Sequence, residues 1–286
     1  MRIGFDAKRA FLNNTGLGNY SRDTIRVLSN YFPDNKYFLY TPKAKENSRL
    51  SFLNSNSNTF VRTPKSLLNR ALKSYWRSKS IVKDLFTNKI DIYHGLSHEL
   101  PLGIEKTSIK SVVTIHDLIF IRYPHLFSTI DRKIYLKKFK SACERADKII
   151  AISQQTKQDI IDFLEIPESK ITVVYQGCNN IFQKPIAESK KEETLKKHNI
   201  PTEYLLNVGS IEERKNLLTL LQALKELPNQ KLVVIGNGKS YKIKCLRYIK
   251  EHNLSGRVMF LSNLTLEEMA VIYQSAQLMT YPSIFE

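Results

Sequence analysis

A histidine and an aspartate stand directly after a β-branched run of this sequence, at a place where chemistry is common. His116 and Asp117 follow the run at 111–115. If that run is a strand of a parallel sheet, both side chains lie at its carboxyl edge, where open α/β folds bind ligands. A histidine there can donate a hydrogen bond to a substrate hydroxyl. The alternative is that His116 only satisfies local backbone groups and that Asp117 caps the next turn.

Two further histidines and three cysteines are candidate metal ligands. His94 and His98 have an i, i+4 spacing, which metal ligands use on helices, but neither a helix nor a third ligand supports a metal there. Cys143, Cys178 and Cys245 are far apart and form no CxxC pair. The sequence therefore predicts neither a zinc site nor a disulfide framework.

A pair of adjacent cations gives the sharpest chemical signal. Arg214 and Lys215 follow an apolar run that ends at Gly209, and they precede an expected helix. A guanidinium fork, an ammonium group and a positive helix end together suit a diphosphate. The alternative is a solvated loop in which Glu212 and Glu213 pair with these cations.

Glycines follow two of the expected strands. Gly16 and Gly18 let backbone amides approach an anion or a sugar at a helix start. The run is GxGxxS, and no acidic residue ends the second strand, so a dinucleotide fingerprint is disfavoured. A plain tight turn is the alternative. Gly236 begins a second glycine turn, which we expect to shape a pocket wall.

The elements that must position these residues alternate between short apolar runs and longer helical patterns, which predicts βα units and parallel sheets. Expected strands are 2–5, 37–40, 90–93, 111–115, 148–152, 171–174, 204–208, 231–235, 257–261 and 278–281. Expected helices are 19–31, 66–86, 130–146, 154–164, 216–226, 241–253 and 266–275. The polar stretch 53–59 is predicted to form a surface loop.

The length of 286 residues accommodates two domains. The region 182–201 contains two prolines and many charges and is the least strand-like, so it is the best linker candidate. We therefore expect an N-terminal acceptor-side domain at 1–182 and a C-terminal nucleotide-binding domain at 183–286, both Rossmann-like.

The net charge of +17 indicates a surface that attracts polyanions, namely nucleic acid, phosphorylated ligands or an anionic membrane. Between residues 62 and 89, eight basic residues accompany a single acid, Asp84, and apolar residues recur near helical spacing. Two interpretations are open. The helix packs its apolar face into the core, or it lies on an anionic bilayer or a polyanionic acceptor.

The termini and the composition bear on the compartment. The hydrophobic content of 42% suits a globular protein, no apolar run reaches the roughly 20 residues that span a bilayer, and the first residues do not resemble a signal peptide. A cytoplasmic protein is expected. The chain ends in a strand, a turn and Glu286, which predicts a fragment cut inside its ligand site.

The order of these motifs resembles the family 4 glycosyltransferases, which are retaining enzymes of GT-B architecture with two Rossmann-like domains. The resemblance spans nearly the whole chain. Its pieces are TGLGNY at 15–20, VVTIHDL at 112–118, ADKIIAISQQTKQDI at 146–160, ITVVYQGCNNIF at 171–182, LLNVGSIEERKN at 205–216, LVVIGNG at 232–238 and YPSIFE at 281–286.

The resemblance implies roles for individual residues. Arg214 and Lys215 would hold the donor diphosphate and stabilise the leaving nucleoside diphosphate, so that no metal is needed. Gly16 and Gly18 would line the cleft near the donor phosphate and the acceptor. His116 would contact the transferred sugar. Glu286 matches the first glutamate of an E-x7-E motif, and the second would lie beyond the chain.

The leading hypothesis is a retaining transfer of a hexose, with mannose the first choice, from a nucleotide diphosphate sugar to a growing cell-surface glycan or a lipid-linked acceptor. Such work in polysaccharide or lipopolysaccharide biosynthesis fits a cytoplasmic protein held peripherally at the membrane through residues 62–89. No cofactor besides the donor substrate is expected. The alternatives are a non-catalytic remnant and a basic nucleic-acid-binding protein, for which no known signature appears.

Overall fold

The structure is a computed structural model that describes residues 1–285 of the chain. Glu286, one of the expected site residues, lies outside the described residues. The chain divides into two compact units, residues 1–177 (unit 1) and the residues from 178 onward (unit 2). The sequence analysis placed the domain boundary between residues 182 and 183.

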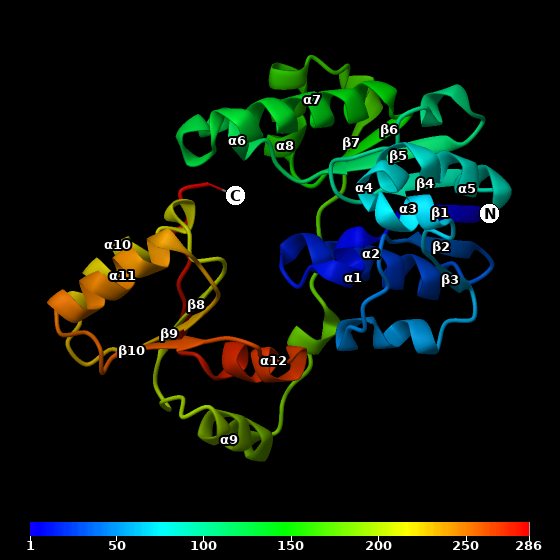
Figure 1. Cartoon of the computed structure of the whole chain (residues 1–286). Coiled ribbons are helices and arrows are strands. Elements are labelled where there is room, and N and C mark those ends of the chain that lie inside the picture. Colours follow the sequence, from blue (N-terminus) through cyan, green and yellow to red (C-terminus); the bar gives the residue numbers. More distant parts are fainter. Residues whose placement is uncertain (286) are drawn as a thin grey trace. The chain divides into compact units, whose positions relative to one another are not determined.

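Unit 1 is built on a seven-stranded parallel sheet with the order β3-β2-β1-β4-β5-β6-β7 (Figure 1). Its strands are β1 (Arg2–Asp6), β2 (Lys36–Tyr40), β3 (Thr59–Arg62), β4 (Ile92–Gly95), β5 (Lys110–Ile115), β6 (Lys148–Ala151) and β7 (Ile171–Val173). All pairings are parallel, so the carboxyl ends of these strands share one edge of the sheet.

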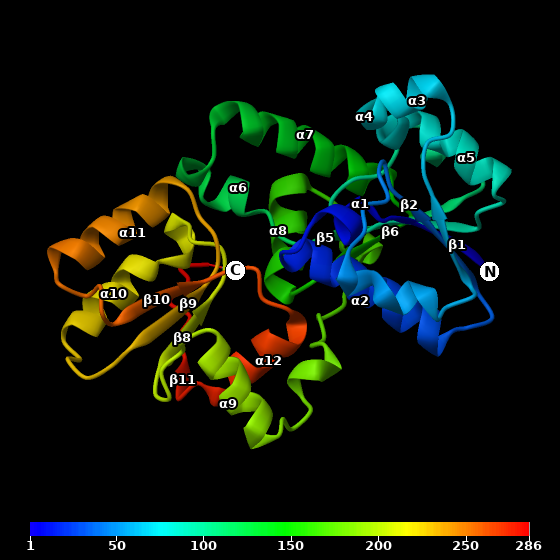
Figure 2. The same ribbon diagram turned by 60° about the horizontal axis from the view of Figure 1, so that its bottom comes forward.

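Helices cover both faces of this sheet. Figures 1 and 2 show α1 and α2 on one face and α5, α7 and α8 on the other. The helical segments are α1 (Lys8–Leu12), α2 (Gly16–Tyr31), η1 (Ser48–Asn54), α3 (Leu67–Ala71), α4 (Lys73–Tyr75), η2 (Trp76–Ser80), α5 (Ile81–Thr87), η3 (Ile104–Lys106), α6 (Ile119–Arg122), η4 (Pro124–Leu126), α7 (Thr129–Arg145), α8 (Gln154–Leu164) and η5 (Glu168–Lys170). Among residues 1–285, no helix combines the length and the apolar character needed to cross a bilayer.

Strand β2 shows why the sheet of unit 1 is covered on both faces. Tyr37 and Leu39 belong to the core cluster under α1 and α2, whereas Phe38 and Tyr40 belong to the cluster on the other face. Side chains alternate between faces along a strand, so a continuous apolar run buries both sides. The apolar run at 37–40 therefore fills the cores on both faces of the sheet.

Unit 2 contains a four-stranded parallel sheet with the order β10-β9-β8-β11. Its strands are β8 (Leu205–Val208), β9 (Leu232–Ile235), β10 (Val258–Leu261) and β11 (Leu278–Met279), and its helical segments are η6 (Asn180–Phe182), α9 (Glu188–Lys197), η7 (Glu213–Lys215), α10 (Leu217–Lys225), α11 (Ser240–Glu251) and α12 (Leu266–Ser275). Helices α10 and α11 cover one face, and α9 and α12 cover the other (Figure 1). The two parallel sheets confirm the expected α/β class with Rossmann-like layers.

Two local expectations were wrong. The single helix expected at 66–86 is divided, because Leu72 leaves helical geometry at φ −100° and ψ 58° and a π-helical turn, η2, follows α4. The expected linker contains helix α9, whose polar sequence is supported by i, i+3 ion pairs such as Lys191 with Glu188. The polar stretch 53–59 is a surface loop at residues 55–58, as predicted, and only its ends belong to η1 and to the short edge strand β3.

Candidate functional site

Each sheet has one point where its strand order reverses direction. In unit 1 the chain proceeds from β1 to β2 and β3 on one side and continues from β4 on the other, so the reversal lies between β1 and β4. In unit 2 it lies between β8 and β11. Open parallel sheets bind ligands outside the carboxyl ends of the strands at such points. Most of the residues singled out from the sequence lie in loops at or beside these two places.

His116 follows β5 at the carboxyl edge of unit 1 and is buried. Its Nε2 lies 2.9 Å from the carbonyl oxygen of Leu96, and its ring meets that of Tyr20 edge to face at 4.6 Å. A carbonyl oxygen only accepts hydrogen bonds, so Nε2 carries the proton. Asp117 accepts a hydrogen bond from the backbone N–H of Ile119, as the turn-capping alternative predicted.

The protonation state of His116 follows from these surroundings. Burial lowers its pKa to about 4, although the hydrogen bond to Leu96 acts in the opposite direction. The ring is therefore neutral at pH 7, with its proton on Nε2 and a lone pair on Nδ1. The expectation that His116 donates to a substrate hydroxyl is corrected, because its one N–H is committed to Leu96. The other ring nitrogen can only accept.

His94 joins a buried polar chain rather than a metal site. Its Nε2 lies 2.8 Å from the hydroxyl of Thr114, which in turn lies 2.9 Å from the hydroxyl of Tyr20. His98 stacks on Phe139 with ring centroids 4.2 Å apart. The rings of His98 and His116 also meet edge to face, with centroids 5.1 Å apart. Within residues 1–285 no group of three potential ligands is arranged to hold a metal ion.

The side chain of Asn13 holds the glycine loop after β1 together through hydrogen bonds within the loop. The Asn13 side-chain oxygen accepts hydrogen bonds from the backbone N–H groups of Thr15 and Gly18, at 2.8 and 3.2 Å. Gly18 packs so closely that a Cβ would lie 1.9 Å from the Asn13 carbonyl oxygen, whereas Gly16 has open space around it. Packing therefore explains Gly18, and Gly16 presents the accessible backbone of the loop.

A partly buried ion network at the reversal point of unit 1 was missed by the sequence analysis. Arg77 of η2 contacts Asp6, the last residue of β1, at 2.8 Å and Glu99, which follows β4, at 2.5 Å. Lys138 of α7 also contacts Glu99 at 3.2 Å. Burial opposes ionisation of Glu99, but Arg77 and Lys138 hold its pKa below the usual value. The available signal in the sequence was Asp6, whose carboxylate directly follows the first expected strand, 2–5.

Arg214 and Lys215 lie in η7, between β8 and α10, at the reversal point of unit 2. Arg214 donates to the carbonyl oxygen of Phe285 and, at 2.9 Å, to the carboxylate of Glu212. Lys215 donates to the hydroxyl of Tyr281 and lies 4.8 Å from the centroid of its ring. The cation pair therefore lies against the turn after β11, the turn that leads to the undescribed Glu286.

Two glycines bring the loops of unit 2 together. The loops after β8 and β9 run so close that a Cβ on Gly236 would lie 1.8 Å from the carbonyl oxygen of Gly209. A Cβ on Gly238 would lie 2.3 Å from the carbonyl oxygen of Ile211, and these two residues form an isolated parallel bridge. Backbone packing explains why the turn after β9 requires glycine at both positions, and it fixes the loop that carries Arg214.

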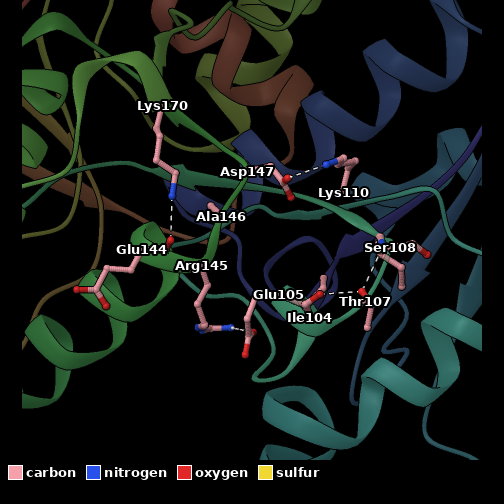
Figure 3. A pocket seen from close by; sticks show the side chains of 11 residues that line it. Ile104, Glu105, Thr107, Ser108, Lys110, Glu144, Arg145, Ala146, Asp147 and Lys170 are labelled. Carbon is pink, nitrogen blue, oxygen red and sulfur yellow. Dashed lines mark hydrogen bonds and ion pairs between the residues drawn. The ribbon is translucent and has the colours of Figure 1, made fainter.

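A hollow of about 470 Å³ lies elsewhere, at the opposite edge of the unit 1 sheet, where strands begin (Figure 3). Several of its charged side chains pair with one another or with backbone groups. Lys110 contacts Asp147 at 3.1 Å, Arg145 contacts Glu105 at 3.5 Å, and Lys170 donates to the carbonyl oxygen of Glu144. Its lining therefore carries no group that the expected chemistry uses.

Comparison with known protein families divides the chain at a similar place. Residues 16–180 match the family described as Glycosyltransferase Family 4, and residues 190–286 match the group described as Glycosyl transferases group 1. The first match includes His116 and the second includes the loop of Arg214 and Lys215.

Curated relatives are similar over most of the chain. The serotype-specific mannosyltransferase WbdA of Escherichia coli is 27% identical over 203 residues, which are 68% of this chain and 25% of WbdA. The O-antigen chain mannosyltransferase B of Escherichia coli is 25% identical over 68% of this chain and 51% of its own length. The O-antigen chain mannosyltransferase RfbU of Salmonella typhimurium is 24% identical over 74% and 55%. The chain thus spans between a quarter and about half of the length of these relatives.

Solved structures share the fold. Sucrose-phosphate synthase from Thermosynechococcus elongatus has a TM-score of 0.76 at 18% identity, covering 100% of this chain and 76% of that one. Anabaena HepE in complex with UDP-glucose has a TM-score of 0.72 at 16% identity, covering 99% and 74%. These neighbours have the expected GT-B architecture of two Rossmann-like domains. The fold and the match over 16–180 together show that the chain belongs to glycosyltransferase family 4.

Proposed function

We propose that this chain binds a nucleotide diphosphate sugar through unit 2 and transfers its hexose to a glycan or a lipid-linked acceptor. One observation carries the proposal. Arg214 and Lys215 lie together at the strand-order reversal of unit 2, against the turn at 281–285. Two adjacent cations at the ligand-binding edge of a parallel sheet supply the positive charge that a diphosphate requires.

The same groups account for leaving-group stabilisation. Helix α10 begins shortly after Lys215, so its positive N-terminal end adds to the guanidinium and ammonium charges. When the glycosidic bond to the diphosphate breaks, negative charge develops on the phosphate oxygens. Cations fixed beforehand stabilise that charge more in the transition state than in the ground state, and this difference lowers the barrier.

The donor is best sought among mannose nucleotides. Three relatives carry names as mannosyltransferases, which makes GDP-mannose the first candidate. Anabaena HepE was solved with UDP and with UDP-glucose, so UDP-hexoses are the second. The O-antigen names of two relatives favour a cell-surface glycan as the acceptor.

The transfer itself would proceed with retention of the anomeric configuration. In the proposed step the acceptor hydroxyl attacks the anomeric carbon from the face that the diphosphate leaves. The bond from that carbon to the diphosphate oxygen breaks, and the hydroxyl proton passes to that oxygen while Arg214 and Lys215 hold the departing group. His116 would accept a hydrogen bond from a hydroxyl of the transferred sugar through Nδ1. The anomeric configuration of the product, measured by nuclear magnetic resonance, tests retention directly. An inverted product would contradict this step.

Calorimetric titration tests the donor site. We expect GDP or UDP to bind the chain and Arg214→Gln to weaken that binding about 10- to 100-fold, because a charge-assisted hydrogen bond contributes about 1.5–3 kcal/mol. Nucleoside binding should change little. Arg247→Gln is the matched control, since Arg247 is an exposed arginine on α11.

Two results of this titration would contradict the proposal. Equal losses for the nucleoside and the nucleoside diphosphate in Arg214→Gln would remove the diphosphate role of this arginine. Equal losses in Arg214→Gln and Arg247→Gln would show a general charge effect. Binding of the donor without transfer to any acceptor would favour the non-catalytic alternative.

A further inference from the structure

Helices α3 and α4 expose an apolar surface that the rest of unit 1 does not cover. Leu67, Leu68, Leu72 and Tyr75 have exposed fractions of 83%, 63%, 50% and 46%. All four lie in two short helical segments, α3 and α4, or at Leu72, the break between them, and we call them together the α3–α4 face. Exposed apolar clusters of this kind typically mark an interaction site.

The α3–α4 face differs from the helical turns that follow it. Trp76, Ile81 and Leu85, on η2 and α5, are fully buried in the core of unit 1. The helical segment therefore does bury an apolar face, as one interpretation predicted, but only over its second half. Its first half begins with the capped helix α3, in which the Ser66 hydroxyl accepts from the Asn69 N–H, and Leu67 and Leu68 of this helix are nevertheless exposed.

The charge around the α3–α4 face identifies its occupant. Lys65, Arg70 and Lys73 interrupt the exposed leucines and are themselves exposed. The only acid between residues 62 and 89, Asp84, accepts a hydrogen bond from the Trp76 ring N–H at 2.7 Å. Leucines that can insert between lipid chains, surrounded by cations that can contact lipid phosphates, complement an anionic bilayer.

We propose that the α3–α4 face docks unit 1 peripherally on an anionic membrane surface. The position of the α3–α4 face determines which part of unit 1 the docking would bring to the bilayer. Helix α3 follows the carboxyl end of β3, and Arg77, shortly beyond α4, holds Asp6 and Glu99 at the carboxyl edge of the same sheet. Docking would therefore hold that edge close to the bilayer. A benefit for a lipid-linked acceptor rests on the proposed function, but the docking does not.

Co-sedimentation of the full chain with lipid vesicles tests the proposal. We expect binding to phosphatidylcholine vesicles that contain about one third phosphatidylglycerol, and weak binding to pure phosphatidylcholine. Leu67→Ser/Leu68→Ser/Leu72→Ser should lower the partition coefficient about 100-fold, because each inserted leucine contributes about a factor of five. Arg70→Gln/Lys73→Gln should lower it about 25-fold on anionic vesicles only.

A matched control distinguishes vesicle binding through the α3–α4 face from nonspecific binding by any exposed apolar residues. Ile243 and Leu246 are exposed on α11 and are flanked by Lys242 and Lys244, so Ile243→Ser/Leu246→Ser removes similar groups from unit 2. This control should bind vesicles as the parent chain does. Thermal melting shows whether each variant folds, and calorimetry with GDP shows whether donor binding is retained, so failure of docking and failure of the proposed function can be distinguished.

Three results would overturn the proposal. The first is a parent chain that does not bind anionic vesicles. The second is an equal loss of binding in the α11 control. The third is full vesicle binding by the leucine variant together with complete competition by duplex DNA, which would identify the surface as a general polyanion site.

Discussion

Buried histidines gather at the carboxyl edge of the unit 1 sheet, and burial sets their charge. Burial lowers the pKa of His94 to about 3 and that of His116 to about 4, and it lowers the pKa of His98 well below its usual value. Each ring is therefore neutral at pH 7 and serves as a hydrogen-bonding group. For His116 this means that a sugar hydroxyl would be bound by an acceptor and not by a cation.

The stability of unit 1 should consequently fall on mild acidification. Well above pH 6.5 these histidines are neutral in both the folded and the unfolded chain, so they contribute no pH dependence. Below about pH 6.5 the unfolded chain binds protons that the folded chain excludes, so the free energy of unfolding falls by up to about 1.4 kcal/mol per pH unit for each histidine. Denaturant titrations between about pH 6.5 and 5 measure this slope.

Two variants test whether His94 contributes to the slope of the free energy of unfolding against pH. His94→Gln keeps a group that can reach the Thr114 hydroxyl but cannot titrate, so the slope should decrease by about one proton. His125 is exposed, and His125→Gln serves as the control, which should keep the slope of the parent chain. An unchanged slope in His94→Gln would mean that this histidine does not titrate as its burial predicts.

At the scale of elements, the loops that carry the site are fixed by backbone packing at single glycines. Gly18→Ala and Gly236→Ala place a methyl group 1.9 and 1.8 Å from a carbonyl oxygen, and backbone atoms cannot rotate away as a side chain can. We expect each variant to lower the free energy of unfolding by about 1–3 kcal/mol. Gly16→Ala and Gly256→Ala, where a Cβ would meet no atom within 4 Å, should change it by less than about 1 kcal/mol.

Denaturant unfolding of these four variants is the measurement. The prediction requires the two crowded positions to differ clearly from the two open ones. Comparable effects at Gly16 and Gly18 would show that the α2 loop rearranges freely, and Gly18 would then have no packing role.

The element pattern was largely predictable from the sequence, because buried parallel strands form apolar runs that few other structures produce. The same pattern correctly predicted that His116 follows one strand and that the Arg214 loop follows another. It did not predict the partner of each side chain, such as the Leu96 carbonyl oxygen that His116 contacts. Asn13, which closes the glycine loop, and Arg77, which crosses from η2 to Asp6, depend on the folded arrangement and not on hydrophobic spacing.

The predictions that were wrong failed for physical reasons of the same kind. Helix α9 is almost entirely polar, so hydrophobic periodicity cannot reveal it, and its burial is limited to Thr194. The division of the expected helix 66–86 arises where the chain passes from the exposed α3–α4 face to the buried Trp76. Apolar spacing indicates a helix in both halves, but it does not show which half the core covers.

At the scale of the whole molecule, the chain contains two units with separate cores, and each unit has its own parallel sheet. The core clusters of unit 1 contain no residue of unit 2, and the reverse also holds within residues 1–285. We therefore expect two thermal transitions in differential scanning calorimetry. Gly18→Ala should lower one transition and Gly236→Ala the other, which assigns each transition to its unit.

Ligand and pH should then act on different transitions. A nucleoside diphosphate at about 100 times its dissociation constant stabilises the unit that binds it by about 2.7 kcal/mol, which corresponds to an increase in Tm of about 10 °C for a unit of this size. We expect this increase in the transition that Gly236→Ala lowers. Acidification from about pH 6.5 to 5 should lower mainly the transition that Gly18→Ala lowers, because the three buried histidines belong to unit 1. An increase confined to the unit 1 transition would place the donor on the other sheet and refute the assignment of Arg214 and Lys215.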